Sequence, residues 1–180
     1  EGLTFTKEQL HRLYTDVPFA IVLSNFTDLE TGQSPLWARP YVLRQVNGIR
    51  IGFLGVTAAF QAFYRLMGWD VTSPQEAVSD WVQHFREEVD HWVVLSHIGI
   101  HEDVRLAEVL PPSSLILGAH THNLFPDGKW LGDCLIAEAG KYGEYVGHVE
   151  VRYDVRRRRV VEIESGRIVL RGTSADLLAD

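Results

Sequence analysis

The chain has 180 residues, of which 46% are hydrophobic and 23% are charged, and these proportions are typical of one ordinary globular domain. Its net charge of −7 argues against nucleic-acid binding, and no stretch approaches the roughly 20 apolar residues that span a membrane. The single cysteine, Cys134, excludes a disulfide framework within the chain and favours a reducing compartment, so we expect a cytoplasmic location.

The first part of the chain predicts helices and strands in alternation. A helix is expected to begin after Thr6, because Thr6 and Gln9 have the spacing of a capping box. A longer helix is expected over residues 74–89, with Ser73 as its N-cap and Pro74 as its first residue. Asn47-Gly48 predicts a tight hairpin turn, because both residues of such a turn take positive φ. Strands are expected at 19–23, 41–46, 49–56, 92–96 and 115–117.

The last third of the chain predicts mainly strands. A helix that contains Leu106 is expected before them, and Pro111-Pro112 would end it. The run of four arginines at 156–159 lies between strand-like segments and is interpreted as a solvated turn. Strands are expected at 135–137, 146–153, 160–163 and 168–170. The alternation along the whole chain favours an α/β fold.

Histidines follow two of the expected buried strands. The strand at 92–96 runs into His97 and then Gly99, and the strand at 115–117 ends in Gly118, His120 and His122. Functional groups of parallel α/β sheets collect beyond the carboxyl ends of the strands, so these histidines can converge. Neutral imidazole binds borderline divalent metals, and histidines two apart on an extended segment point to one side. The pattern therefore predicts a metal site.

Two motifs carry a resemblance to a known family. Ser-His-Ile-Gly at 96–99 resembles the Ser-His-x-Gly motif of calcineurin-like metallophosphoesterases, and Gly-Ala-His-Thr-His at 118–122 resembles their Gly-x-His-x-His motif. Asp103 stands where members similar to 5'-nucleotidases often carry an acid. Ser24-Asn25, Gly140 and the segment 145–151 are similar as well, and the likeness spans roughly residues 1–165.

The resemblance implies an α/β sandwich of two sheets flanked by helices. Residues 1–172 would be the C-terminal portion of the catalytic domain, with its N-terminal half missing, and residues 173–180 would be a tail. His97 and His120 would ligate one of two divalent ions (Mn, Fe, Zn or Mg), and His122 would ligate the other. The expected near-site residues are Glu1, Asn25, Asp103, Gly99 and Gly118, and Glu1 would be the last acid of a Gly-Asn-His motif.

The remaining ligands of the family, including its Asp-x-His pair and bridging Asp, would lie ahead of Glu1. The parent protein is expected to hydrolyse phosphate monoesters, with nucleotides as the expected substrates. No residue of this chain is assigned a catalytic role. The chain alone is expected to bind at most one metal weakly, to be inactive or nearly so, and to form a homo-oligomer through apolar surface that the missing half would cover.

Two other interpretations remain open. The chain could be a binding or regulatory module that keeps the fold without the chemistry, or a mononuclear zinc hydrolase with three histidine ligands. Single residues also have alternative roles. Asp103 could cap a helix or hold an imidazole tautomer, Asn25 and Asp28 could form an Asx-type turn, and Cys134 could be a small buried hydrophobe.

Overall fold

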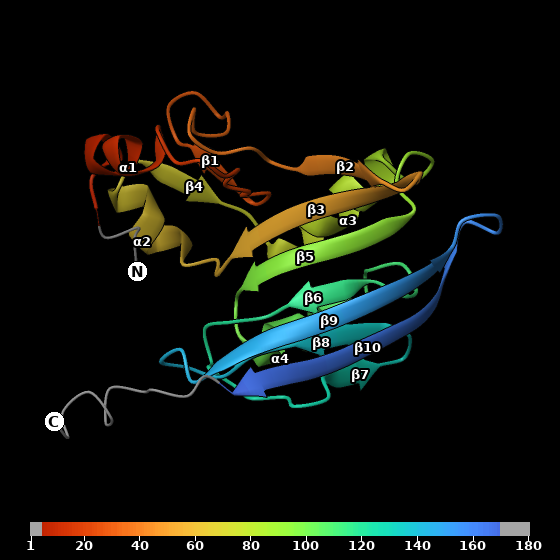
Figure 1. Cartoon of the computed structure of the whole chain (residues 1–180). Coiled ribbons are helices and arrows are strands. Elements are labelled where there is room, and N and C mark those ends of the chain that lie inside the picture. Colours follow the sequence, from red (N-terminus) through yellow and green to blue (C-terminus); the bar gives the residue numbers. More distant parts are fainter. Residues whose placement is uncertain (1–4, 170–180) are drawn as a thin grey trace, which may run out of the picture.

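A six-stranded sheet forms the centre of the fold in the computed structural model, which describes residues 5–169 (Figure 1). Its strand order is β2-β3-β5-β6-β8-β7, and the four inner strands run parallel while each edge strand is antiparallel to its neighbour. The strands are β2 (Val42–Val46), β3 (Ile49–Thr57), β5 (His91–His97), β6 (Leu115–Leu117), β7 (Lys129–Leu131) and β8 (Cys134–Ala137). The α/β prediction is confirmed, because this is the parallel core that such folds share.

The predicted hairpin between β2 and β3 is confirmed. Val46 pairs with Ile49, and the two turn residues have φ of 51° at Asn47 and 85° at Gly48. Such left-handed conformations suit Asn and Gly better than other residues, which is why this dipeptide indicates the turn.

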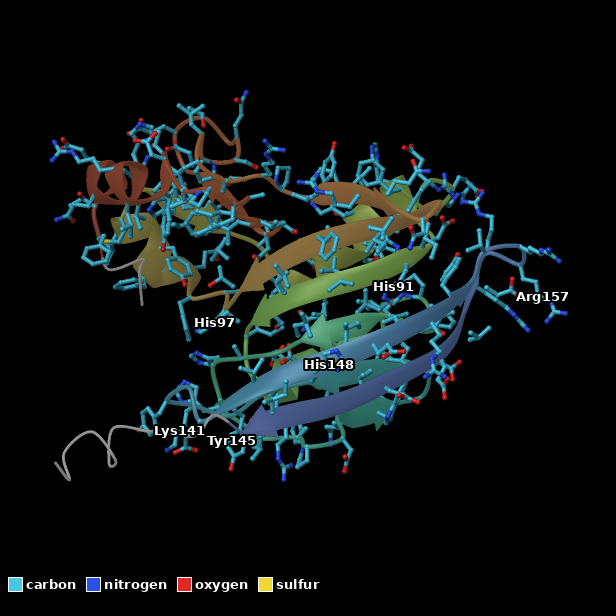
Figure 2. The ribbon with its side chains drawn as sticks, in the orientation of Figure 1. His91, His97, Lys141, Tyr145, His148 and Arg157 are labelled. Carbon is cyan, nitrogen blue, oxygen red and sulfur yellow. The ribbon has the colours of Figure 1, made fainter. Side chains whose placement is uncertain are left out.

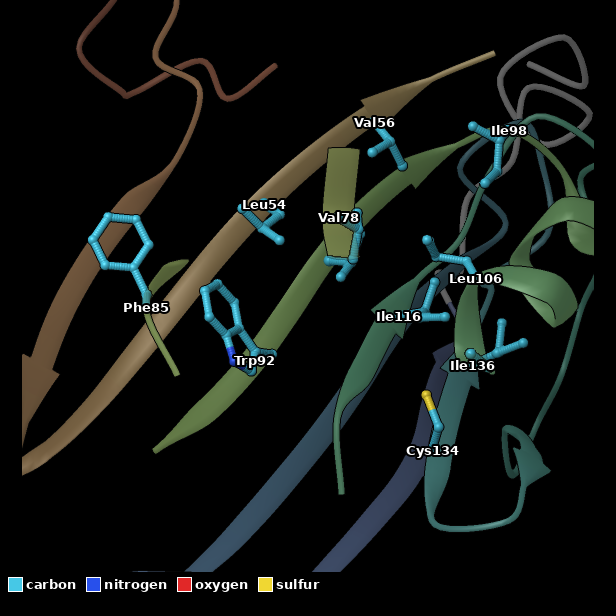
Figure 3. Packing of buried hydrophobic residues seen from close by; sticks show 12 residues of the cluster. Leu54, Val56, Val78, Phe85, Trp92, Ile98, Leu106, Ile116, Cys134 and Ile136 are labelled. Carbon is cyan, nitrogen blue, oxygen red and sulfur yellow. The ribbon is translucent and has the colours of Figure 1, made fainter. Parts of the chain in front are cut away.

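Two helices, α3 (Pro74–His84) and α4 (Ile100–Ala107), cover one face of the sheet. The Ser73 hydroxyl accepts a hydrogen bond from the Glu76 amide, as expected for an N-cap, although the helix ends earlier than predicted. Between helices and sheet lies the main core, to which Leu54 and Ile116 belong (Figure 3). Leu54, Val94 and Ile116 are fully buried on the successive strands β3, β5 and β6. Cys134 is also buried here, as expected for a small hydrophobe.

A long hairpin of β9 (Tyr145–Asp154) and β10 (Arg159–Val169) lies across the opposite face of the sheet (Figure 1). Its Val149 and Ile163 pack on the buried residues Val93, Leu115 and Leu135. The prediction of two strands at 160–163 and 168–170 was wrong, because the antiparallel pairing continues through Ser165-Gly166. The turn predicted at the arginine run is confirmed, but Arg158 also forms an ion pair with Asp90. Residues 170–180, including the expected tail, lie outside the described residues.

The N-terminal layer has a separate small core. It consists of α1 (Lys7–Tyr14), β1 (Phe26–Asp28), α2 (Gln61–Leu66) and β4 (Trp69–Val71), packed around Leu10, Phe26, Tyr64 and Trp69. The predicted capping box at Thr6 is confirmed by reciprocal hydrogen bonds with Gln9. No helix among residues 5–169 is long and apolar enough to cross a membrane.

The strand predicted at 19–23 was wrong. This segment forms one isolated bridge, Val22 with Arg39, and Phe19 is 64% exposed. Regular pairing begins only at Phe26, which pairs with Val71 of β4. Between the two segments, the Ser24 amide donates to the Gly55 carbonyl and the Gly55 amide donates to the Ser24 hydroxyl. Apolar composition alone did not specify the ladder that a strand requires.

Candidate metal centre at the carboxyl ends of the strands

The parallel strands bring the expected site residues to one edge of the sheet. His97 is the last residue of β5 (Figure 2). It pairs with Thr57, the last residue of β3. His97 is exposed, while Ser96 and Ile98 on either side of it are buried. The alternation along β5 therefore fixes the backbone around His97 and leaves its imidazole accessible.

His97 and His120 lie next to each other, as the sequence predicted. Their ring centres are 5.2 Å apart and the ring planes are inclined by 66°. Two imidazoles bound to one tetrahedral zinc through bonds of roughly 2.0–2.1 Å have ring centres about 5 Å apart. The spacing of this pair therefore fits a shared divalent ion.

His122 does not complete a three-residue cluster with this pair. Within residues 5–169, no group of three or more His, Cys, Asp or Glu side chains is arranged to hold a metal ion. An extended segment was expected at residues 120–122, but His120 and His122 have φ of 80° and 58°. The backbone turns at both residues, so side chains two apart need not share one side. The metal role of His122 stays a prediction.

Gly99 allows the two motif segments to touch. It has φ of 88° at the start of α4, and a Cβ there would meet Thr121 Cγ2 at 3.0 Å and His120 Cδ2 at 3.4 Å. The Thr121 hydroxyl in turn accepts a hydrogen bond from the Ile100 amide at 3.1 Å. The glycine thus lets the loop after β6 pack against the beginning of α4, which brings His120 toward His97.

Asp103 lies beneath the histidine motifs rather than among them. It is fully buried within α4, and one of its carboxyl oxygens accepts a hydrogen bond from the Ser96 hydroxyl. Burial raises the pKa of Asp103 to about 6, because the charged form is poorly solvated there. Asp103 is therefore neither a helix cap nor an exposed ligand; it supports the residue that precedes His97.

Glu138 is a second buried acid, which the sequence analysis missed. One of its oxygens accepts a hydrogen bond of 2.9 Å from the Asn123 amide, directly after His122. Burial raises its pKa, and the charge of Asp103 raises it further. The signal in the sequence was one acidic residue directly after the apolar strand β8, a position that also suits a surface loop.

Asn25 connects the N-terminal layer to the site edge of the sheet. Its amide group donates hydrogen bonds to the carbonyls of Thr57 and Thr72, and its side-chain oxygen accepts one from the Thr57 amide. Asp28 forms the Asx-type turn considered for this segment, accepting hydrogen bonds from the amides of Glu30 and Thr31. Glu1 lies outside the described residues.

Comparisons with known proteins place this geometry in context. No protein-family model matches the chain. It is 39% identical over 161 residues to YunD of Bacillus subtilis, named an uncharacterized metallophosphoesterase, covering 89% of this chain and 35% of that protein. It is 30% identical over 122 residues to the trifunctional nucleotide phosphoesterase YfkN of the same organism, covering 64% of this chain and 8% of that protein. The chain thus spans about a third or less of these relatives.

Several solved structures share the fold. A 5'-nucleotidase precursor from Thermus thermophilus superimposes with a TM-score of 0.73 at 22% identity, covering 92% of this chain and 36% of that one. The sulfate thiohydrolase SoxB of Thermus thermophilus gives 0.79 at 21% identity, covering 93% and 31%. NAD nucleotidase of Haemophilus influenzae gives 0.76 at 13% identity, covering 92% and 37%.

The expected resemblance is confirmed. Over most of its length the chain is similar to metallophosphoesterases of the 5'-nucleotidase-like type, and it corresponds to part of their α/β fold. The similarity in sequence is to the metallophosphoesterase YunD, at 39% identity, and the solved structures confirm the fold.

Proposed function

We propose that this chain supplies part of the active site of a metal-dependent phosphoric ester hydrolase that acts on phosphate monoesters. The pairing of His97 and His120 at the carboxyl ends of parallel strands carries the proposal, in a chain 39% identical to a metallophosphoesterase. Nucleotides are the proposed substrate class, because a nucleotide phosphoesterase and several nucleotidases are among the similar proteins.

The residues have distinct proposed roles. His97 and His120 hold one divalent ion (Mn, Fe, Zn or Mg), and His122 contributes to a second. When bound, such a pair of ions neutralises phosphoryl charge and lowers the pKa of water. Gly99 and Thr121 position the loop that carries His120, so the imidazole pair is arranged before any ion binds.

The site within this chain is proposed to be incomplete. The absence of a three-ligand group within residues 5–169 supports the view that further ligands come from outside this chain. A clamp of two ions also needs carboxylates that offset their charge. Residues 1–172 are thus proposed to be one portion of a catalytic domain, able to bind at most one ion weakly and unable, or nearly unable, to turn over substrate.

An apolar strip beside the histidines supports self-association of the isolated chain. Leu95 and Leu117 expose 41% and 37% of their surface. Each lies two residues further along its strand than Val93 or Leu115, and the hairpin covers Val93 and Leu115. We propose that a second copy of the chain covers this strip. Light scattering that finds a monomer at high concentration would contradict this. A cytoplasmic location stays a proposal that rests on the single cysteine.

Zinc binding to the isolated chain, measured by isothermal titration calorimetry, tests the proposed role of the histidine pair. His97→Ala and His120→Ala should each weaken binding by more than about tenfold. His148→Ala is the matched control, because His148 is exposed on β9 rather than at the strand ends (Figure 2). Equal affinity in all four proteins would refute the proposed roles.

Hydrolysis of p-nitrophenyl phosphate with added Mn tests the proposed incompleteness. We expect no turnover above background from the isolated chain. Turnover that is lost in His97→Ala and His120→Ala but kept in His148→Ala would show that this chain holds a complete site. The metal-binding proposal would then stand and the proposed incompleteness would be wrong.

A further inference from the structure

Two buried carboxyl groups approach each other beneath the histidine loops. Asp103 reaches the spot from α4 and Glu138 reaches it from the end of β8. Each has one oxygen without a hydrogen-bond partner among the described residues, Asp103 Oδ2 and Glu138 Oε1. A Cβ added to Gly118 would stand 2.7 Å from the first of these oxygens and 3.0 Å from the second.

The other oxygen of each acid contacts one of the two histidine motifs. Asp103 accepts a hydrogen bond from the Ser96 hydroxyl, next to His97, and Glu138 accepts one from the Asn123 amide, next to His122. Asp103 therefore contacts the end of β5, and Glu138 contacts the loop after β6. A side chain on Gly118 would contact both free oxygens, so this glycine leaves the space beside both of them open.

We propose that Asp103 and Glu138 share one proton, and that this hydrogen-bonded acid pair holds the two histidine segments at the spacing a metal ion requires. Proton sharing satisfies both unpartnered oxygens at once, since one carboxyl donates and the other accepts. The acids are positioning residues that touch neither metal nor substrate. The metal part of the inference rests on the proposed function, whereas the proton sharing does not.

Electrostatics favours the singly protonated pair. Two carboxylates this close in a buried setting cannot both ionise without a large penalty, so one proton stays bound well above the usual range for acids. The pKa of Asp103 is raised to about 6 by burial, and that of Glu138 is raised in the same way. Both pKa values are raised, as expected for a pair of acids that keeps one proton near neutral pH.

The other titratable groups around the pair do not replace that proton. Glu102 on α4 is a further negative charge, and burial raises the pKa of the Cys134 thiol on β8 to about 12, so it stays neutral. Arg167 on β10 lines the same cavity as Glu138, but its guanidinium lies over the Tyr145 ring at 5.6 Å. His120 and His122 follow Gly118 on the exposed loop.

Urea unfolding between pH 4.5 and 7.5 tests the proton sharing without any metal. Acids with raised pKa values in the folded state stabilise it at low pH, so the wild-type unfolding midpoint should fall as pH rises through about 6. Glu138→Gln supplies an N–H donor that does not ionise. It should flatten this pH dependence and leave stability at pH 7.5 equal to or above that of the wild type. Asp103→Asn is a second variant with the same expectation.

Glu108→Gln, at the exposed end of α4, is the matched control and should keep the wild-type pH profile. A wild-type slope that persists in both Glu138→Gln and Asp103→Asn would overturn the proton sharing. Gly118→Ala would place a methyl group against both free oxygens and should remove the slope while lowering stability at every pH.

Zinc affinity of the same variants tests the positioning role. Glu138→Gln should bind zinc within about twofold of the wild type, while Gly118→Ala should lose about tenfold or more. Equal zinc affinity in Gly118→Ala and the wild type would overturn the positioning role. Flattened pH profiles together with no zinc binding by any protein would instead confirm the proton sharing and refute the proposed metal function.

Discussion

Replacing Asn25 by alanine should destabilise the contact between the N-terminal layer and the central sheet. The side chain makes hydrogen bonds of 2.9, 3.0 and 3.0 Å to backbone groups of Thr57 and Thr72, and Asn25 is 2% exposed. Each bond contributes about 1 kcal/mol, and the buried Thr57 groups would lose their partners, so the expected loss in the free energy of unfolding is about 3 kcal/mol. At a urea dependence of about 2 kcal/mol per molar, the midpoint should fall by about 1.5 M.

Equilibrium unfolding in urea at pH 7 measures this loss. Asn25→Asp is an informative second variant, because it keeps the acceptor for the Thr57 amide but directs a charge at two carbonyl oxygens, so it should be at least as unstable. Gln83→Ala, on the exposed side of α3, is the control and should change stability by less than about 0.5 kcal/mol. An Asn25→Ala midpoint equal to that of this control would refute the role given to the three hydrogen bonds.

Three smaller tests address other parts of the fold, each by urea unfolding. Gly55→Ala should cost about 3 kcal/mol, because a Cβ would meet the Val22 carbonyl carbon at 2.7 Å and its oxygen closer still; a neutral effect would contradict that packing. Ser73→Ala should cost about 1 kcal/mol through loss of the helix N-cap, and no change would show that the cap is dispensable. Burial opposes ionisation of Asp90, but hydrogen bonds from two arginines hold its pKa well below the usual value. Its contribution should be complete above about pH 4 and should decline progressively as the pH falls below that value. Asp90→Asn should therefore cost about 1 kcal/mol at pH 7 and less at pH 2, and an equal cost at both would refute the ion pairs.

Local chemistry made several elements predictable from the sequence. The Asn47-Gly48 turn and the Ser73-Pro74 helix start depend on conformations that few residue types adopt, so each motif indicates one structure. The placement of His97 at the end of a buried strand was predictable for a similar reason. An apolar run that changes abruptly to His and Gly indicates where the sheet ends.

The features that escaped prediction depend on contacts between distant segments. The run at 19–23 has strand-like composition, yet pairing is decided by its neighbours Arg39 and Gly55, and it forms a single bridge. Glu138 could not be recognised from the sequence, because nothing near it in the chain reveals that Asp103 approaches from another element. Left-handed backbone at His120 and His122 was equally hidden, because neither is a residue type that requires it.

Arg158 and Asp90 join the tip of the β9–β10 hairpin to the beginning of β5, and Arg50 at the beginning of β3 binds the same carboxylate. This junction lies at the amino ends of the parallel strands, while the histidines lie at their carboxyl ends. The ion pairs that hold the hairpin and the histidines proposed to bind metal therefore lie at opposite ends of the parallel strands. Mutations, low pH or high salt that break these ion pairs should weaken the packing of the hairpin on the sheet, while the histidine pair keeps its arrangement. Tolerance to amino-acid substitution should therefore differ between the two ends of the strands.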